Sequence, residues 1–413
     1  MKRRILFTED EPNVLRGLRR LFQSMEMQWD VVFAESAQAA LHLLEQAPLD
    51  VLVSDIRMPG MDGAQLLTTV AERYPHLIRI ILSGHADQRT ILQSVMSAHQ
   101  YLAKPCDPEL LQATIARACA LCDKLTDTSL QRAVCGLRTL PSSPDLYLQL
   151  CKTIEDVNCP LEQIGSIMAR DIAMTAHLLK LVNSAFFGVH GAVSSPFKAV
   201  ELLGRDLIKA LAVSSNFFAP CDPACLRQLD LAAVYRRGLE TAILAKKIAQ
   251  EVCLQPRVAD EAYTAGLLHG VGKLVVACNL EASYREVCNL IHQQELTDWE
   301  AERSVLGTTH AEIGAYLIEL WGLPQPIIES LAFYNCLSTS SERSFGPWSA
   351  VYIARILIDE IEHTKTETII PIDDYLAGLN LSDRFVAWRA SYQAVRGNLQ
   401  TAGGQHLRAV ARF

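Results

Sequence analysis

The chain has 413 residues, a formal net charge of −8, and a composition in which half of the residues are hydrophobic. This length suits two or three domains with separate cores, and the acidic balance argues against general nucleic-acid binding. No apolar run reaches the ~18 residues of a membrane span, and the start, MKRRILFTEDEP, is typical of a first strand rather than of a secretory signal. We therefore expect a cytoplasmic protein that binds neither nucleic acid nor a membrane.

Residues 1–120 alternate short β-rich runs with amphipathic helices. The predicted strands are ILFTED, DVVFAE, DVLVSD, RIILSG and QYLAKP, at 5–10, 30–35, 50–55, 79–84 and 100–105. The predicted helices span 13–25, 37–47, 63–74, 90–97 and 108–119. This alternation predicts a doubly wound α/β fold with a parallel sheet and helices on both faces. In such sheets, function gathers at the carboxyl ends of the strands.

Polar side chains end four of the five predicted strands. Glu9 and Asp10 end the first, Asp55 the third, Ser83 the fourth and Lys104 the fifth. Three convergent carboxylates would repel one another, so a hard divalent cation is expected among them. Asp55 can accept a phosphoryl group, with Mg²⁺ and Lys104 neutralising the charge that develops on it. The Ser83 hydroxyl can then donate a hydrogen bond to a phosphoryl oxygen.

The stretches TEDEPNVL, VSDIRMPGMDG, ILSGHAD and YLAKP closely resemble the receiver domain of two-component response regulators, over residues 1–122. The resemblance implies that Asp55 is the phosphoacceptor. It also implies that Glu9, Asp10 and Asp55 bind Mg²⁺, assisted by the backbone carbonyl of Arg57. Glu9 stands where the family usually has Asp, which keeps the charge and lengthens the reach.

The same resemblance implies three residues that respond to the phosphoryl group. Ser83 takes the position of the switch hydroxyl and Tyr101 that of the switch aromatic side chain. Lys104 takes the position of the phosphate-binding lysine, and in such domains the bond to the following Pro105 is cis. Phosphorylation is expected to pull Ser83 and Tyr101 inward.

A helical segment connects this domain to the rest of the chain, and we assign residues 123–138 to the linker. Its apolar residues follow a heptad-like spacing: Leu111, Ile115, Ala118, Cys122 and Leu125, then Leu130, Val134 and Leu137. Two interpretations stay open: a last receiver helix packed on its own sheet, or a seam for the second domain or for a homodimer through 111–137. Cys119 and Cys122 lie three apart on this helix, a spacing that favours packing over metal binding.

After residue 130 the sequence shows capped helical patterns, which predict an all-α bundle of a dozen or so helices. One predicted helix, ADEAYTAGLLHGVGKLVVACNL, spans 259–280. The stretches LRTLPSSPDLYLQL, IMARDIAMTAHLLKLVNSAFFG and SSPFKAVELLGRDLIKAL resemble the HDOD domain, a relative of the HD metal-dependent phosphohydrolases. We assign 139–340 to this domain and 341–413 to a C-terminal helical extension of it.

The metal-ligand positions of an HD phosphohydrolase can be followed along the matching helices. They read, in chain order, Arg237, His269-Gly270, His310 and Tyr334-Asn335. Arginine repels a metal ion and the carboxylate of the His-Asp pair is missing, so we expect this to be a degenerate HD site without metal chemistry. The two histidines would then be hydrogen-bonded core or cleft residues. Lys273 would be a solvated charge at a helix end or a remnant of a nucleotide site.

These features favour a bacterial response regulator. A partner histidine kinase would phosphorylate Asp55, and a catalytically inactive HDOD output module would respond by binding an unidentified signalling protein. The expected chemistry is limited to self-phosphorylation and dephosphorylation at Asp55, with Mg²⁺ in the receiver as the cofactor. The alternative is an HDOD module that keeps phosphodiesterase or nucleotide-binding activity towards a cyclic dinucleotide or similar phosphoester. A transcription factor is disfavoured because the sequence has neither a recognisable helix-turn-helix nor a basic patch.

Overall fold

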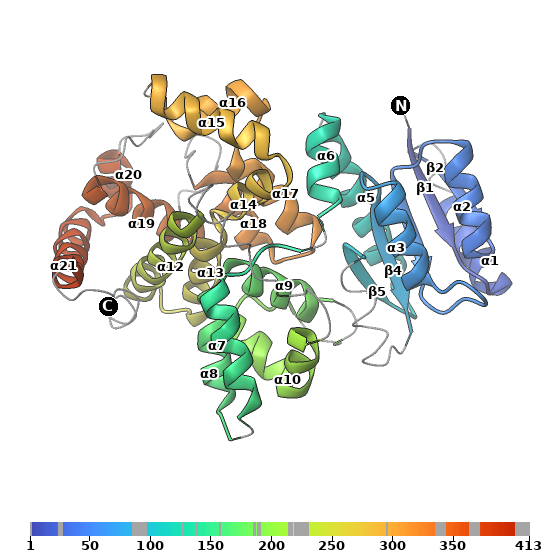
Figure 1. Ribbon diagram of the computed structural model, residues 1–413, viewed down its shortest axis with the longest axis horizontal. Helices are drawn as coiled ribbons and strands as arrows, with labels where there is room; N and C mark the ends of the chain where they lie inside the picture. The colour runs from blue at the N-terminus through green and yellow to red at the C-terminus, as the bar shows by residue number, and fades with distance from the viewer. Residues whose placement is uncertain are drawn as a thin grey trace.

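The structure is a computed structural model, and it shows a parallel sheet beside a helical bundle (Figure 1). It describes residues 2–23, 28–84, 97–124, 127–137, 139–156, 158–184, 187, 191–213, 218, 231–294, 296–334, 344–362 and 372–400.

The N-terminal domain contains a five-stranded parallel sheet with the order β2-β1-β3-β4-β5. Its strands are β1 (Arg3–Thr8), β2 (Trp29–Ala34), β3 (Val51–Asp55), β4 (Ile78–Ser83) and β5 (Gln100–Ala103). The central strand β3 is buried along its whole length, as its apolar sequence requires for a strand covered on both faces. This architecture is the doubly wound, flavodoxin-like fold predicted from the sequence.

Four helices of this domain lie within the described residues: α1 (Pro12–Gln23), α2 (Ala37–Gln46), α3 (Gly63–Arg73) and α5 (Pro108–Lys124). Polar caps fix two of their starts. Ser36 accepts a hydrogen bond from the backbone of Ala39, and Asp62 forms a capping box with Gln65. The helix predicted over 90–97 falls almost entirely outside the described residues.

The described residues after α5 are almost entirely helical, as predicted. A short helix, α6 (Thr128–Cys135), comes first. The bundle helices are α7 (Pro144–Glu155), α8 (Leu161–Met168), α9 (Ile172–Val182), α10 (Pro196–Val213), α12 (Leu231–Val252), α13 (Pro256–Leu268), α14 (Val271–Asn279), α15 (Glu281–Gln294), α16 (Asp298–Leu306), α17 (His310–Leu320), α18 (Gln325–Phe333), α19 (Pro347–Glu362), α20 (Ile372–Gly378) and α21 (Ser382–Gln400). None of the helices described is long and apolar enough to cross a bilayer.

The predicted helix over 259–280 is in fact two helices, α13 and α14, which meet at His269 and Gly270. The chain is closely packed at two glycines beside this break. A Cβ atom at Gly270 would lie 2.9 Å from Val234 Cγ1, and one at Gly272 would lie 1.9 Å from the carbonyl oxygen of His310. Gly270 thus leaves room for Val234 of α12, and Gly272 brings α14 directly against α17.

The apolar stripe of α5 is buried as far as the structure describes it, from Leu111 to Cys122, while Leu125 lies outside the described residues. Helix α5 contacts both β3 of its own sheet and α17 of the bundle. Burial also raises the pKa of Cys119 to about 12, which keeps this thiol protonated and fits the predicted packing role. The stripe therefore serves the receiver core and the domain interface together.

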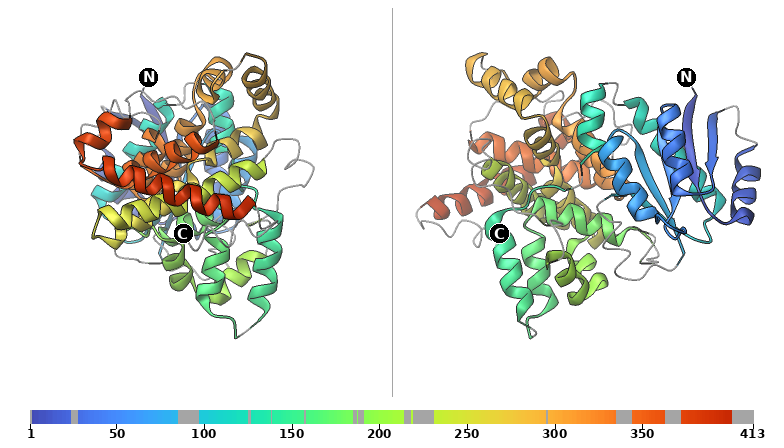
Figure 2. Two further views of the ribbon diagram at one scale, coloured as in Figure 1. Left: turned by 90° about the vertical axis from the view of Figure 1, so that its left-hand side faces the viewer. Right: turned by 45° about the vertical axis from the view of Figure 1, so that its right-hand side comes forward.

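The C-terminal helices are attached to the bundle by buried polar contacts. On α21, Trp388 donates from Nε1 to Glu251 Oε2 at 2.5 Å, and Tyr392 donates from its hydroxyl to Glu240 Oε2 at 3.1 Å. Both acceptors belong to α12. The extension is thus part of the same packed unit as the bundle, and Figure 2 shows it on the side away from the sheet.

Candidate functional site

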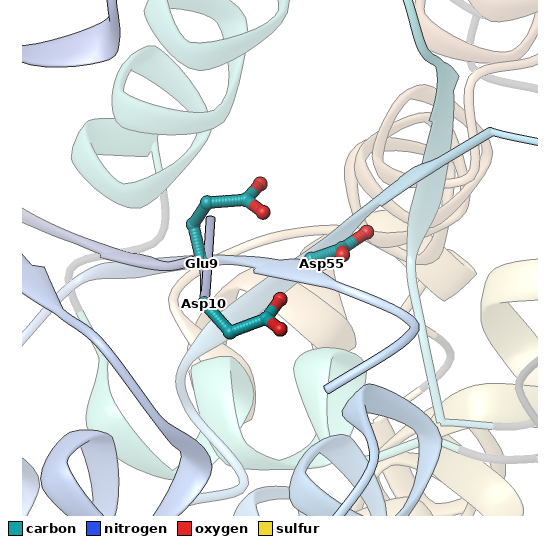
Figure 3. A group of neighbouring side chains, drawn as sticks. All are labelled: Glu9, Asp10 and Asp55. Atoms are coloured by element: carbon teal, nitrogen blue, oxygen red, sulfur yellow. The ribbon is translucent and has the colours of Figure 1, made fainter. Parts of the chain in front are cut away.

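Three carboxylates meet at the carboxyl edge of the sheet (Figure 3). Glu9 and Asp10 follow β1 and Asp55 ends β3, and one oxygen of each lies within 4.8 Å of the others. Glu9 is 1% exposed and Asp55 is 7% exposed. Asp55 Oδ1 accepts a hydrogen bond from the backbone N–H of Ile56 at 2.8 Å, which orients the carboxylate. Strand pairing brings residues 45 positions apart in the chain to one point.

Lys104 links two of these acids. Its Nζ lies 2.6 Å from Glu9 Oε2 and 2.9 Å from Asp55 Oδ1. Burial acts to lower the pKa of Lys104, but the bonds to the two acids raise it above its ordinary value, so the ammonium stays charged. Burial raises the pKa of Glu9, although Lys104 opposes the rise. The Lys104–Pro105 peptide bond is cis, as the resemblance implies.

The donor set of this edge suits a divalent cation. Three carboxylates lie beside one ammonium, so the site keeps a net negative charge that a hard cation would balance. All the ligand atoms that these side chains offer are oxygen, which such cations prefer. Asp10 and Arg57 also line an adjoining pocket of about 450 Å³ with Ile56, Met58, Pro59 and Asp62.

The two switch positions are both buried. The Ser83 hydroxyl is 2% exposed and makes no hydrogen bond within the part of the chain that the structure describes. A buried hydroxyl in this condition costs free energy until an acceptor reaches it. Tyr101 is 5% exposed, so its ring already lies inward, whereas the sequence suggested an inward movement on phosphorylation.

The bundle contains a second group of charged residues around Arg237. Its guanidinium donates to Glu362 Oε2 from Nε at 3.0 Å and from Nη2 at 2.7 Å, and to Asp359 Oδ1 at 2.8 Å. The neighbouring Arg236 lies 2.8 Å from Glu362 Oε1 and 3.1 Å from Glu240 Oε2. These contacts join α12 to α19 and lower the pKa of Glu362 to about 2, against the opposing effect of burial.

His310 is engaged at both ring nitrogens. Nδ1 lies 2.7 Å from a carboxylate oxygen of Glu302, and Nε2 lies 2.6 Å from the Tyr334 hydroxyl. All three side chains are buried. Tyr334, which the sequence resemblance places at a metal-ligand position of HD phosphohydrolases, fills the space beside His310 with a phenol whose pKa burial raises.

His269 and Lys273 complete this region. His269 Nδ1 lies 2.7 Å from the Gly266 carbonyl oxygen, and burial lowers the pKa of His269 to about 3. Lys273 forms an ion pair with Asp298, and this pair lowers the pKa of Asp298 well below its ordinary range. The Lys273 side chain is 24% exposed, so it is partly solvated and is also paired with a carboxylate from the start of α16.

Sequence reasoning missed the acids that accompany the degenerate HD residues: Asp298, Glu302, Asp359 and Glu362. A signal did exist for two of them. An arginine in a buried helical position needs a carboxylate partner, and the run Asp359-Glu360-Ile361-Glu362 places two acids three residues apart on one helix face. Nothing in the sequence ties that face to Arg237 rather than to solvent.

Aspartyl phosphorylation requires an accepting carboxylate, a cation site and a positive group for the phosphoryl oxygens in one place. The carboxyl edge of this sheet brings such groups together, and the N-terminal domain is of the receiver class. Residues 5–116 match the family model of the response regulator receiver domain, and residues 140–336 match that of the HDOD domain. The chain therefore contains a response regulator receiver domain followed by an HDOD domain.

Several curated proteins are similar to parts of the chain. An uncharacterized protein of Treponema pallidum (strain Nichols) is 28% identical over 267 residues, 62% of this chain and 46% of that protein. The hydrogenase transcriptional regulatory protein HoxA of Cupriavidus necator is 35% identical over 116 residues, 28% of this chain and 23% of HoxA. The DNA-binding transcriptional regulator NtrC of Escherichia coli (strain K12) is 35% identical over 123 residues, 29% of this chain and 25% of NtrC. The chain thus spans less than half the length of these relatives.

Two solved structures are also similar. The signal receiver domain of an HD domain-containing protein from Pseudomonas fluorescens Pf-5 is 29% identical, covering 29% of this chain and 96% of that one, with a TM-score of 0.28. The MmoQ response regulator from Methylococcus capsulatus str. Bath is 22% identical, covering 61% of this chain and 97% of that one, with a TM-score of 0.48.

Proposed function

We propose that a partner histidine kinase phosphorylates this response regulator on Asp55 and that the phosphoryl group controls the protein interactions of the HDOD module. In the transfer, a carboxylate oxygen of Asp55 forms a bond to phosphorus and the imidazole of the donor phosphohistidine leaves. The observation that carries the proposal is the Asp55 carboxylate 2.9 Å from the Lys104 ammonium and beside Glu9 and Asp10.

Each neighbouring group has a role in this proposal. Glu9, Asp10, Asp55 and the carbonyl of Arg57 hold Mg²⁺, which supplies neutralisation of the charge on the phosphoryl oxygens when bound. Lys104 contacts the phosphoryl group directly. Ser83 donates its hydroxyl to a phosphoryl oxygen, which would satisfy the one hydrogen bond that it lacks within the described residues.

The HDOD module acts in this proposal as a binding module without catalysis. Arg237 is held by Asp359 and Glu362, and His310 by Glu302 and Tyr334. Hydrolysis at a metal needs free ligand atoms and an open position for water. At His310, both ring nitrogens are already hydrogen-bonded. At His269, the next residue is Gly270, which has no side chain to bind a metal.

The proposed organisation is a receiver at 1–122, a linker at 123–138, the HDOD domain at 139–340 and an extension at 341–413. The extension contributes Glu362 to the Arg237 cluster and Tyr392 to α12. We place the protein in the cytoplasm with its kinase. A homodimer through residues 111–137 is compatible with the proposal only if the partner avoids the α5 surface that α17 contacts.

The direct test is phosphorylation with acetyl phosphate and Mg²⁺, followed by intact mass. The wild-type chain should gain one phosphoryl group, and Asp55→Asn should gain none. Asp30→Asn is the matched control, because Asp30 pairs with Arg4 on the surface away from the acidic edge. Full labelling of Asp55→Asn would overturn the assignment.

A further inference from the structure

The receiver and the bundle meet at the end of the sheet opposite the acidic edge. Arg79, near the start of β4, has a fully buried guanidinium that donates to three carbonyl oxygens. These belong to Ser97 at 2.6 Å, to Leu77 at 2.8 Å and to Cys135 at 2.8 Å. The last acceptor lies outside the receiver, at the C-terminal residue of α6.

His99 makes a second bond to the same carbonyl. Its Nδ1 accepts from the backbone N–H of Arg79 at 2.9 Å, which places the ring proton on Nε2. Nε2 then donates to the Cys135 carbonyl at 2.8 Å. Burial, followed by the charge of Arg79, lowers the pKa of His99 well below its ordinary value, which agrees with a neutral ring that has one donor and one acceptor.

The bonded carbonyl is one of those that a helix cannot satisfy internally. The last four carbonyls of an α-helix lack intrahelical partners, and the helix dipole places negative charge there. Arg79 and His99 therefore cap α6 from the receiver, and the positive guanidinium meets the negative end of the dipole. The close fit extends to Gly136, where a Cβ atom would lie 3.1 Å from the Cβ of Pro75 in the receiver.

The neighbouring helix α17 is held in the same way. Gln100, the first residue of β5, donates from Nε2 to the carbonyl of Leu320 at 3.1 Å and more weakly to that of Glu319 at 3.4 Å. These two residues end α17. Lys124 adds an ion pair to the Glu319 side chain at 2.9 Å. Helices α6 and α17 also contact each other, with Cys135 Sγ 3.7 Å from the Tyr316 hydroxyl.

Arg79, His99 and Gln100 thus form a clasp that holds α6 and α17 by their C-terminal carbonyls. Figure 1 shows these two helices on the side of the bundle that faces the sheet. The same two strands reach the acidic edge at their other ends. Strand β4 ends in Ser83, and β5 is followed by Lys104. Four residues of strand place Arg79 about 13 Å from Ser83, so each of the two strands runs from the acidic edge to the clasp.

Resting on the function proposed above, we propose that the clasp of Arg79, His99 and Gln100 restrains α6 and α17 in the unphosphorylated protein, and that phosphorylation of Asp55 releases it. Four of its six bonds to carbonyl oxygens cross to α6 and α17, and three of these four are between 2.8 and 3.1 Å in the present state. A shift of β4 and β5 towards the phosphoryl group would lengthen these interdomain bonds. Release would free the ends of both helices for a partner.

Hydrogen–deuterium exchange on the full chain tests this proposal. Beryllofluoride with Mg²⁺ should raise the exchange of segments 128–137 and 316–322 about 5- to 150-fold, the range of a typical coupling between sites. Gln100→Glu should raise the exchange of 316–322 without any phosphoryl analogue, because a carboxylate placed against two carbonyls repels them. The control is Gln46→Glu, the same change on the exposed surface of α2.

Arg79→Lys should raise exchange in 128–137, because a single ammonium cannot span three carbonyls. If Arg79→Lys does not fold, the exchange of Gln100→Glu decides between the outcomes. Unchanged exchange in both segments of wild type with beryllofluoride, or a change confined to one helix, contradicts the release. Wild-type exchange in Gln100→Glu contradicts the clasp itself. If intact mass shows that acetyl phosphate does not modify Asp55, the proposed function and the release both fail. The exchange of segment 316–322 in Gln100→Glu still tests the clasp in that case.

Discussion

Single side chains decide which contacts the helical bundle makes around Arg237 and His310. Arg237 stands at the position that resembles a first metal ligand, and its positive charge is held by Asp359 and Glu362 from α19. Tyr334 takes the free nitrogen of His310 in the same manner. At this scale the side chains form an internal ion-pair and hydrogen-bond network that joins α12 to α19 and engages both ring nitrogens of His310.

The Arg237 network predicts a large loss of stability when its cation is removed. Arg237→Ala would leave Asp359 and Glu362 without this partner, and breaking a buried pair costs about 3–5 kcal/mol. Because Arg237 is 29% exposed, and because Arg355 still pairs with Asp359 and Arg236 with Glu362, we expect a loss below that range, about 2 kcal/mol. Urea denaturation measures the difference.

The matched control for this change is Arg257→Ala. Arg257 also pairs with an acid, Glu261, but its side chain is 66% exposed. Solvent screens such a pair, so the control should lose no more than about 1 kcal/mol. Equal losses in the two variants would show that the Arg237 network does not hold α12 and α19 together.

Pairs of elements are fixed by close backbone contact as well as by side chains. Helix α14 lies against α17 because Gly272 leaves no side chain between them, and a Cβ atom there would lie 1.9 Å from the carbonyl oxygen of His310. This contact also sets the position of His310 at the start of α17. Gly272 therefore fixes how closely α14 and α17 can pack.

Two glycine-to-alanine changes test this packing. Gly272→Ala should lower the free energy of unfolding by about 1–3 kcal/mol, because overpacking forces α14 and α17 apart. Gly17→Ala, in α1 with nothing within 4 Å of the new Cβ, should raise it by about 0.4–1 kcal/mol through a less flexible unfolded chain. Thermal or urea unfolding of both variants measures these changes. An unchanged free energy of unfolding in Gly272→Ala would contradict the packing argument.

The whole molecule shows which features a sequence can predict. The doubly wound fold and the meeting of Glu9, Asp10 and Asp55 follow from a general rule, since parallel strands bring their carboxyl ends to one edge. The clasp follows from no such rule. Arg79 and Cys135 are 56 positions apart, and Gln100 and Leu320 are 220 apart. Helical periodicity predicts which face is apolar but not which partner it meets, so the domain interface and the acids around Arg237 needed the structure.

The central claim is that this chain carries out phosphate chemistry in its receiver alone and uses its helical bundle for binding. Metal content tests it most directly, since an HD-type hydrolase requires bound transition metal. After dialysis of the purified full chain against metal-free buffer, elemental analysis should find well under one Fe, Mn or Zn per chain. About one or two equivalents, lost in His269→Ala together with a phosphodiesterase activity, would contradict the account.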